Sequence, residues 1–208
     1  MRTRIAADLH DDIGSGLSQI AVLTEVARAR AQGYASELNT ALGDIGSVSR
    51  ELAESMNDIV WSVNPERDRV SDLFQRMRRF ASDVLSGSSI EFTFRASGPG
   101  DVVRVPTELR REVYLIFKEA VNNLVRHSAS TLAEIEVSVH DGRLDLRVED
   151  NGVGLDQRYR NDGHGLRSMS ERARRIGGEI HFGCAGNGGL RVTLKAPFST
   201  NGGRPGPT

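Results

Sequence analysis

Apolar residues recur every three or four positions through the first 63 residues, the spacing of helices that bury one side. The first run consists of Ile5, Leu9, Ile13, Leu17, Ile20 and Leu23. The second run, close to a heptad in spacing, consists of Leu38, Leu42, Ile45, Val48, Leu52, Met56, Ile59 and Val63. We therefore predict one helix over about residues 3–32, ended by Gly33, and a second that ends before Asn64-Pro65.

Two long helices joined by a short turn form a hairpin whose apolar face must be covered. A second copy of the chain covers this face most simply, and two hairpins across a two-fold axis make a four-helix bundle. The alternative is that the hairpin packs against the second half of its own chain. We predict a homodimer, with residues 1–66 as the dimerisation domain.

The pattern changes to alternating polar and apolar residues after the hairpin. Residues 67–89 are interpreted as a connecting segment, a helix over 70–85 followed by Ser86-Gly87-Ser88-Ser89. We predict strands over 90–94, 133–139, 144–148, 179–182 and 190–196, and helices over 107–127 and 166–176. Asp141-Gly142 predicts a two-residue hairpin turn. The fold class is therefore α+β, with helices on a mostly antiparallel sheet over 90–198 and a disordered Gly/Pro-rich tail over 199–208.

Composition excludes several classes of protein. Lys and Arg number 27 against 28 Asp and Glu, so the net charge of -1 argues against direct nucleic-acid binding. Cys184 is the only cysteine, which excludes a disulfide framework and favours a reducing compartment. No apolar run approaches the roughly 18 residues of a membrane span. We expect a cytoplasmic chain without a membrane segment, and an anchor upstream of Met1 is left open.

His10 is the first candidate for chemistry. It lies one residue past the apolar position Leu9, at the edge of the predicted helix's buried stripe, and Asp11 follows it. A neutral imidazole is a good nucleophile near neutral pH, and an adjacent carboxylate can orient it and take up its proton. The alternative is an ordinary solvated surface histidine.

A second candidate lies on the helix predicted over 107–127. Glu119, Asn123 and His127 are spaced four residues apart, so they share one face of that helix. A carboxylate and a carboxamide one turn apart offer the oxygen ligands that Mg²⁺ takes alongside phosphates. A solvated polar face would show the same spacing.

Two glycine-containing segments complete the candidates. Asp150-Asn151-Gly152-Val153-Gly154 directly follows a predicted strand, so the backbone can approach a ligand closely while the acid accepts an amine. Gly163-His164-Gly165-Leu166 opens a helix, whose free amides suit phosphate oxygens. The plain alternatives are an Asx turn for the first segment and a simple loop for the second.

Together these motifs resemble, from about Thr3 to Pro197, the catalytic core of a two-component sensor histidine kinase. The run from Glu119 to His127 is similar to the N box of the GHKL ATPase superfamily, with the acidic residue at Glu119 and the Mg²⁺-bridging asparagine at Asn123, next to Asn122. Asp150, with Gly152 and Gly154, matches the box that receives the adenine amino group. Gly163, His164, Gly165 and Leu166 resemble the second glycine box of the short-lid subfamily, and Leu9 to Gly14 resembles its phosphoacceptor motif.

The resemblance implies a GHKL-type (Bergerat) ATP-binding sandwich after the dimeric helical bundle. It implies autophosphorylation of His10 from Mg-ATP, oriented by Asp11, and transfer of the phosphoryl group to a response regulator receiver domain. Alternatives are a serine/threonine protein kinase of the same superfamily, an ATPase that drives a conformational change, or a binding module with an inactive ATP site. A P-loop enzyme is excluded, because neither Lys118 nor Lys195 follows a glycine.

Two positions depart from the family pattern. Many members of the subfamily have Gln or His five residues after the phosphoacceptor, a position linked to dephosphorylation of the partner, and this chain has Ser15 there. The family's late Gly-Thr pair is Gly189-Leu190, so a hydroxyl often found near the last strand is missing. We expect a kinase with weak phosphatase activity.

Overall fold

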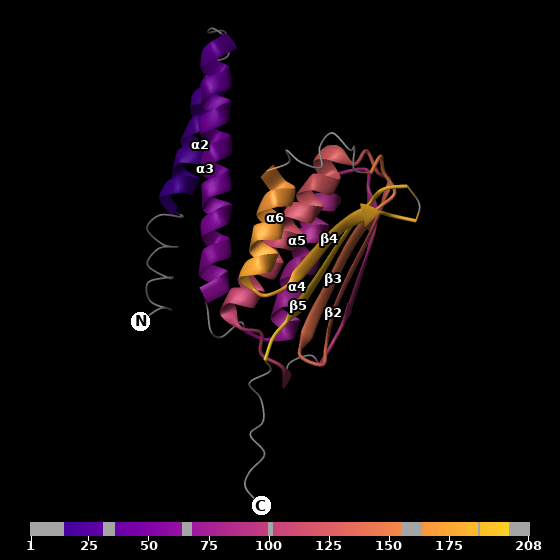
Figure 1. Cartoon of the computed structure of the whole chain (residues 1–208). Helices are drawn as coiled ribbons and strands as arrows, with labels where there is room; N and C mark the ends of the chain where they lie inside the picture. Colours follow the sequence, from indigo (N-terminus) through magenta and orange to yellow (C-terminus); the bar gives the residue numbers. More distant parts are fainter. Residues whose placement is uncertain are drawn as a thin grey trace, which may run out of the picture. The chain divides into compact units, whose positions relative to one another are not determined.

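The computed structural model describes residues 15–30, 36–63, 68–99, 102–154, 164–186 and 188–199. The chain divides into two compact units, Met1–Arg67 and Asp68–Thr208 (Figure 1). His10, Asp11 and Gly163 lie outside the described residues, as do most of the predicted tail and the first part of the first predicted helix.

The first unit is a helical hairpin of α2 (Ser15–Arg30) and α3 (Ser36–Val63), which pack against each other. Small or short side chains occupy buried positions where the two helices approach, among them Ala21, Thr24 and Ser49. The Thr24 hydroxyl donates to the Ile20 carbonyl one turn earlier, so its polar group is satisfied inside the helix. The predicted second helix is confirmed, with its start two residues before Leu38.

The larger aliphatic side chains of the hairpin lie on its outside. The exposed members of the predicted apolar stripe are Ile20, Leu23, Ile45, Val48 and Leu52, whereas Met56 is buried. Small residues let the two backbones approach, and these five aliphatic side chains are left on the outer surface. The hairpin therefore carries an exposed apolar stripe of the kind that a partner surface covers.

The second unit is a five-stranded sheet with helices on one face (Figure 1). Its strands are β1 (Glu91–Ser97), β2 (Leu132–His140), β3 (Arg143–Asp150), β4 (Glu179–Cys184) and β5 (Leu190–Pro197), in the spatial order β1-β2-β3-β5-β4. Only β1 and β2 pair in parallel; the other three pairs are antiparallel. The helices are α4 (Val70–Leu85), α5 (Thr107–His127) and α6 (His164–Arg175). This arrangement confirms the predicted α+β class.

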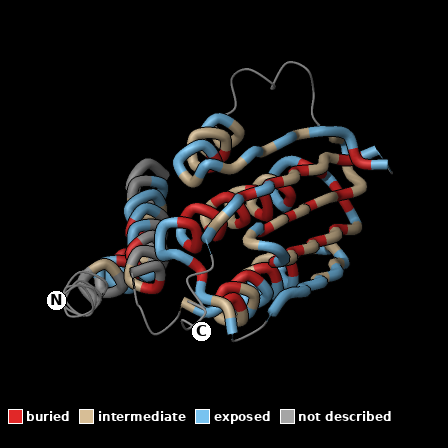
Figure 2. Tube along the Cα trace, turned by 60° about the horizontal axis from the view of Figure 1, so that its bottom comes forward, coloured by how far each residue is buried: buried red, intermediate tan, exposed pale blue. Residues whose placement is uncertain are grey.

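Burial alternates along the central strands, as Figure 2 shows. On β2 and β3 the buried residues are Ala133, Ile135, Val137, Val139, Leu144, Leu146, Val148 and Asp150. All but Asp150 are apolar, so a single acid interrupts an otherwise apolar face. The turn between these strands is the predicted Asp141-Gly142 pair, and both residues have positive φ, 50° and 70°.

Helix α5 forms the centre of the core beneath the sheet. An aromatic cluster joins it to its neighbours, with Phe117 in edge contact with Phe80 of α4 and Phe94 of β1. Helix α4 buries Val70, Leu73, Met77, Ala81 and Leu85 and contacts both α5 and β1. The segment predicted to connect two domains thus belongs, through α4, to the second unit. An apolar stripe predicts that a helix packs, but it does not identify the surface it packs on.

Candidate functional site

Asp150 lies at the end of β3 on the helix-covered face of the sheet and is 4% exposed. Its Oδ1 accepts a hydrogen bond from the Gly152 backbone N–H at 2.8 Å, and the Leu190 backbone N–H also bonds to the carboxyl group. Burial raises the pKa of Asp150 above its ordinary value of 3.8, while these two hydrogen bonds act in the opposite direction. The result is a buried hydrogen-bond acceptor framed by backbone amides.

The backbone is closely packed around this acid. Gly152 lies against the Ser128 carbonyl, where any Cβ would approach closer than the 3.0 Å that real Cβ atoms keep. Gly189, in the turn before β5, lies against Asp150 itself. Gly154 ends the same turn as Gly152 and has a φ of 70°. The predicted glycine-lined turn is thus present, and backbone surrounds the carboxylate on two sides.

Asn151 has a structural role that the sequence pattern does not predict. Its Oδ1 accepts from the backbone N–H groups of Thr131 and Leu132 at 3.0 and 2.9 Å, and its Nδ2 donates to the Thr131 hydroxyl at 3.0 Å. These bonds join the turn after β3 to the start of β2. No local signal predicts this role, because the partners lie 19 and 20 residues away in the chain.

Ser128 likewise has a role that the sequence pattern does not predict, because it joins α5 to the same turn. Its carbonyl accepts from the Val153 N–H at 2.8 Å, and its hydroxyl lies 2.6 Å from the Leu124 carbonyl. The Ser130 N–H donates to the Ser128 Oγ at 3.1 Å, and the two hydroxyls are 2.7 Å apart. Since Ser128 directly follows α5, the end of that helix is tied to the Asp150 turn.

The polar face of α5 meets the beginning of α6. A Cβ on Gly165 would overlap Glu119 Oε1 and lie 3.2 Å from Asn123 Nδ2, so Gly165 is in close contact with both side chains. Glu119, Asn122 and Asn123 are partly buried, whereas His127 is exposed on the last turn. The structure therefore brings Glu119 and Asn123 together at the start of α6, as their spacing predicts, whereas His127 lies one turn further along α5.

Helix α6 begins at His164 and continues through Gly165 and Leu166, as the glycine segment predicts. No acidic residue lies in its first turn. Backbone N–H groups at a helix start have no partner within the helix, and the helix dipole favours an anion there. The described part of this segment is therefore suited to phosphate oxygens.

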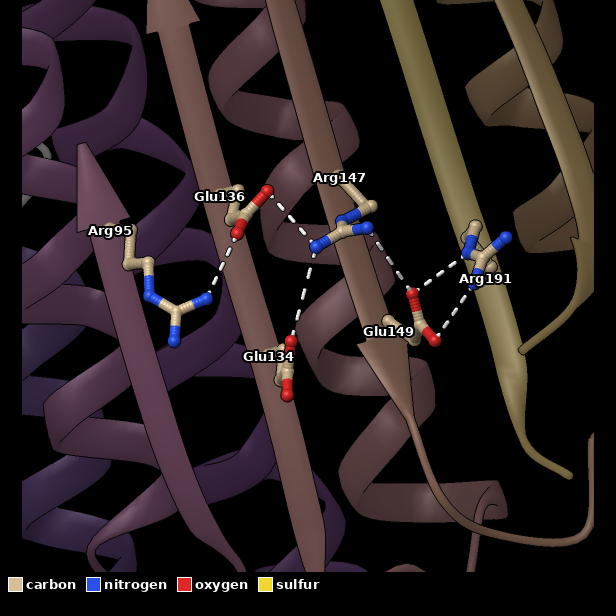
Figure 3. Close-up of polar contacts among 6 residues, drawn as sticks. All are labelled: Arg95, Glu134, Glu136, Arg147, Glu149 and Arg191. Atoms are coloured by element: carbon tan, nitrogen blue, oxygen red, sulfur yellow. Dashed lines mark hydrogen bonds and ion pairs between the residues drawn. The ribbon is translucent and has the colours of Figure 1, made fainter. Parts of the chain in front are cut away.

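A chain of ion pairs crosses the face of the sheet that the helices do not cover (Figure 3). Arg95 contacts Glu136 at 3.1 Å, and Arg147 contacts Glu136 at 3.0 Å. Arg147 also lies 3.9 Å from Glu149. Glu149 in turn receives two hydrogen bonds from Arg191, at 2.7 and 3.0 Å. Hydrogen bonding from Arg191 lowers the pKa of Glu149 below its ordinary value. The two hydrogen bonds of this pair join β3 to β5 beside the site.

Two family models match the chain, one in each unit. Residues 2–68 match the model described as histidine kinase. Residues 108–200 match the histidine kinase-, DNA gyrase B- and HSP90-like ATPase model. The second unit is thus an ATP-binding domain of this ATPase class.

Curated relatives of this chain are sensor proteins. The sensor histidine kinase YxjM of Bacillus subtilis is 25% identical over 199 residues, 96% of this chain and 48% of that protein. The nitrate/nitrite sensor protein NarQ of Escherichia coli is 28% identical over 202 residues, 93% of this chain and 34% of that protein. The chain thus spans about a third to a half of the length of these relatives.

Solved structures share the fold. The blue-light activated histidine kinase of Erythrobacter litoralis EL346 has a TM-score of 0.58 at 18% identity, covering 90% of this chain and 60% of that one. The ATP binding domain of PrrB from Mycobacterium tuberculosis has a TM-score of 0.51 at 22% identity, covering 64% and 99%. Full-length ShkA in complex with AMPPNP has a TM-score of 0.56 at 19% identity, covering 96% and 47%.

The chain belongs to the two-component histidine kinases and comprises the catalytic core of that family. The expected resemblance is thereby confirmed at the level of the family. Within the described residues, no helix is long and apolar enough to cross a membrane.

Proposed function

We propose that this chain transfers the γ-phosphoryl group of ATP to His10 and then passes it to an aspartate on a response regulator receiver domain. The observation that supports this most is Asp150, a buried acceptor in a glycine-lined turn within the unit that matches the ATPase family. Residues 2–68, which match the histidine kinase model, contain His10 and would supply the phosphoryl acceptor N-terminal to the ATPase unit.

ATP fits the groups that this site offers. The adenine exocyclic amine would donate to the Asp150 carboxylate, and Gly152 and Gly154 form the closely packed turn that positions this acid. Gly163, His164, Gly165 and Leu166 would hold the phosphates at the start of α6. Asn122 and His127 complete the proposed nucleotide contacts from α5.

Mg²⁺ is proposed at Asn123, with Glu119 beside it. Both side chains lie next to Gly165, Glu119 through its Oε1 and Asn123 through its Nδ2, at the start of α6 where the phosphates would bind, and the Asn123 Oδ1 would serve as the ligand. Among the described residues, no group of three or more His, Cys, Asp or Glu is arranged to hold a metal. The ion would therefore depend on phosphate oxygens for much of its coordination, as Mg²⁺ commonly does. When bound, it neutralises charge on the phosphates.

The proposed reaction at His10 is an in-line displacement. One imidazole nitrogen attacks the γ-phosphorus, a P–N bond forms, and the bond from phosphorus to the departing ADP oxygen breaks. Asp11 accepts a hydrogen bond from the other ring nitrogen and stabilises the positive charge that develops there. Glu119 is assigned a positioning or proton-accepting role. The phosphoramidate then donates its phosphoryl group to the regulator.

The proposed assembly is a homodimer formed through the exposed apolar stripe of the hairpin. Ile20, Leu23, Ile45, Val48 and Leu52 would be covered by the same residues of a second copy, as two-fold symmetry requires. Because ATP is the donor and a response regulator is the acceptor, we place the reaction in the cytoplasm.

The test is incubation of the chain with radiolabelled ATP and Mg²⁺, followed by treatment of the product with acid or base. A phosphohistidine keeps its label in base and loses it in acid, whereas a serine or threonine phosphate does the reverse. His10→Gln should abolish labelling while ATP binding stays within about twofold of wild type, because the binding groups lie in the other unit. Unchanged labelling of that variant, or a base-labile product, contradicts the proposal.

A further inference from the structure

Glu112 is a buried acid on α5 that no motif includes. It is 2% exposed, and its Oε2 lies 3.0 Å from Arg172 Nη1 on α6, within a hydrogen bond. Arg175 lies 3.9 Å from the same oxygen, and Arg111 lies 3.6 Å from Oε1. A carboxylate removed from water in this way depends on the guanidinium groups around it.

Helix α6 packs on α5, and this packing connects the ion pair to the start of α6, where the phosphates are proposed to bind (Figure 1). At one end of the contact, Gly165 lies against Glu119 and Asn123. Seven residues further along α6, Arg172 meets Glu112, which precedes Glu119 by seven residues on α5. The two helices are therefore antiparallel, and the two contacts lie about two turns apart.

Buried apolar side chains lie along the same stretch of the two helices. They are Met169 and Ala173 of α6 and Ile116 of α5. Apolar packing is non-directional and by itself selects the register of two helices weakly. A slip of α6 by one turn would move Arg172 about 5.4 Å from Glu112 and separate the buried acid from its closest partner. The ion pair thus penalises registers other than the observed one.

We propose that Glu112 is a positioning residue that, through Arg172, holds the start of α6 at the place where it binds the phosphates of ATP. This rests on the proposed function, since it assumes that the start of α6 receives phosphates. Glu112 itself lies two helical turns from that end and acts only through the helix that it holds. Its loss should therefore affect the phosphates of a nucleotide and spare the adenosine part, which is assigned to Asp150.

The experiment compares Mg-ATP with adenosine as ligands of the full chain in calorimetric titrations. Glu112→Gln keeps the shape of the side chain and removes its charge, and we expect ATP to bind about tenfold more weakly while adenosine stays within about twofold. Arg172→Met should act in the same direction, and Arg172→Lys should recover part of the ATP affinity because it keeps a positive charge.

A matched control exists on the same helix. Glu171 pairs with Arg167 at 3.0 Å in an exposed i,i+4 pair, so Glu171→Gln removes an ion pair of α6 without touching Glu112. This variant should bind ATP like wild type. If Glu112→Gln fails to fold, the comparison of Arg172→Lys with Arg172→Met decides the question.

Three results would overturn the inference: equal weakening of ATP and adenosine, no weakening of either, or the same loss in Glu171→Gln. Wild-type chain that binds no ATP would instead overturn the proposed function, and the inference with it. A third outcome separates the two proposals: Asp150→Asn binds adenosine more weakly than wild type, but Glu112→Gln binds both ATP and adenosine with wild-type affinity. That outcome would retain Asp150 as the adenine contact and reject only the role of Glu112.

Discussion

Gly189 and Asp150 are in such close contact that the Asp150 side chain and carbonyl occupy the space of any Cβ at Gly189. The next residue, Leu190, directs its backbone N–H to the same carboxyl group. The acid is therefore positioned by the turn before β5 as well as by its own strand. Although this chain has leucine where the family has threonine, the backbone at that position still bonds to the acid.

The first prediction follows from this contact. Gly189→Ala should displace the Asp150 carboxylate and destabilise the fold by about 1–3 kcal/mol, as overpacking does. Adenine-nucleotide binding should weaken as well. Gly183→Ala is the control, because nothing lies within 4 Å of a Cβ there. Denaturant unfolding and ATP titration of both variants check the prediction; equal behaviour of the two would contradict it.

Asp150→Asn should weaken adenine-nucleotide binding, since an amide can present a donor where the adenine amine needs an acceptor. The loss of a charge-assisted hydrogen bond costs on the order of 1.5–3 kcal/mol, which is roughly tenfold or more in affinity. Calorimetric titration measures the change. Equal affinities of wild type and variant would mean that adenine binds elsewhere.

The raised pKa of Asp150 adds a pH dependence to the same variant. A group whose pKa is raised on folding contributes stability at pH values below its unfolded pKa, and loses that contribution as the pH rises through the folded pKa. The unfolding free energy of Asp150→Asn relative to wild type should therefore increase from about pH 4 upward in the absence of nucleotide. A pH-independent difference in denaturant midpoints would argue against this.

The pair of Glu149 and Arg191 predicts the opposite pH trend. Arg191 lowers the pKa of Glu149, so the pair contributes stability above the ordinary glutamate value of 4.5 and loses it as the pH falls through the folded pKa. Arg191→Met should destabilise the chain at pH 7, and the difference from wild type should shrink on acidification. Arg95→Met, which removes an exposed single contact, should have a smaller effect. Thermal unfolding between pH 3 and 7 tests both.

Val48 is 54% exposed on the apolar stripe of α3 and tests the proposed dimer. Val48→Glu should convert dimer to monomer at a fixed protein concentration, because a charge would be buried between the two copies. Val153→Glu introduces the same charge at a residue of the second unit that is 73% exposed, and should leave the oligomer unchanged. Sedimentation velocity distinguishes the outcomes. A dimer that survives Val48→Glu points to another interface.

Ser15→Gln tests the departure at the position linked to dephosphorylation. A glutamine amide reaches further than a serine hydroxyl and can place a water in line with an aspartyl phosphate. We expect the variant to increase the rate at which a phosphorylated response regulator loses its label, with autophosphorylation retained. The measurement compares both proteins with the same regulator and nucleotide, and equal rates would retire the idea.

Periodicity alone located most elements of this protein. The helix predicted over 107–127 is α5, with the same bounds, and the Asp141-Gly142 turn joins β2 to β3 as predicted. Strand β1 runs three residues past its predicted end, because Arg95, Ala96 and Ser97 continue to pair with β2 although all three are exposed. Local spacing predicts such elements because helices and strands repeat every 3.6 and 2 residues.

Other features were decided only by the tertiary structure. The sequence determined that Asp150 follows a strand and that Glu119 and Asn123 share a helix face. It did not determine that α4 packs in the second unit, that Asn151 joins the turn to Thr131, or that Glu112 is buried against Arg172. These contacts join residues distant in the chain. Hydrogen bonds and ion pairs of this kind depend on how elements pack, and no local repeat encodes that packing.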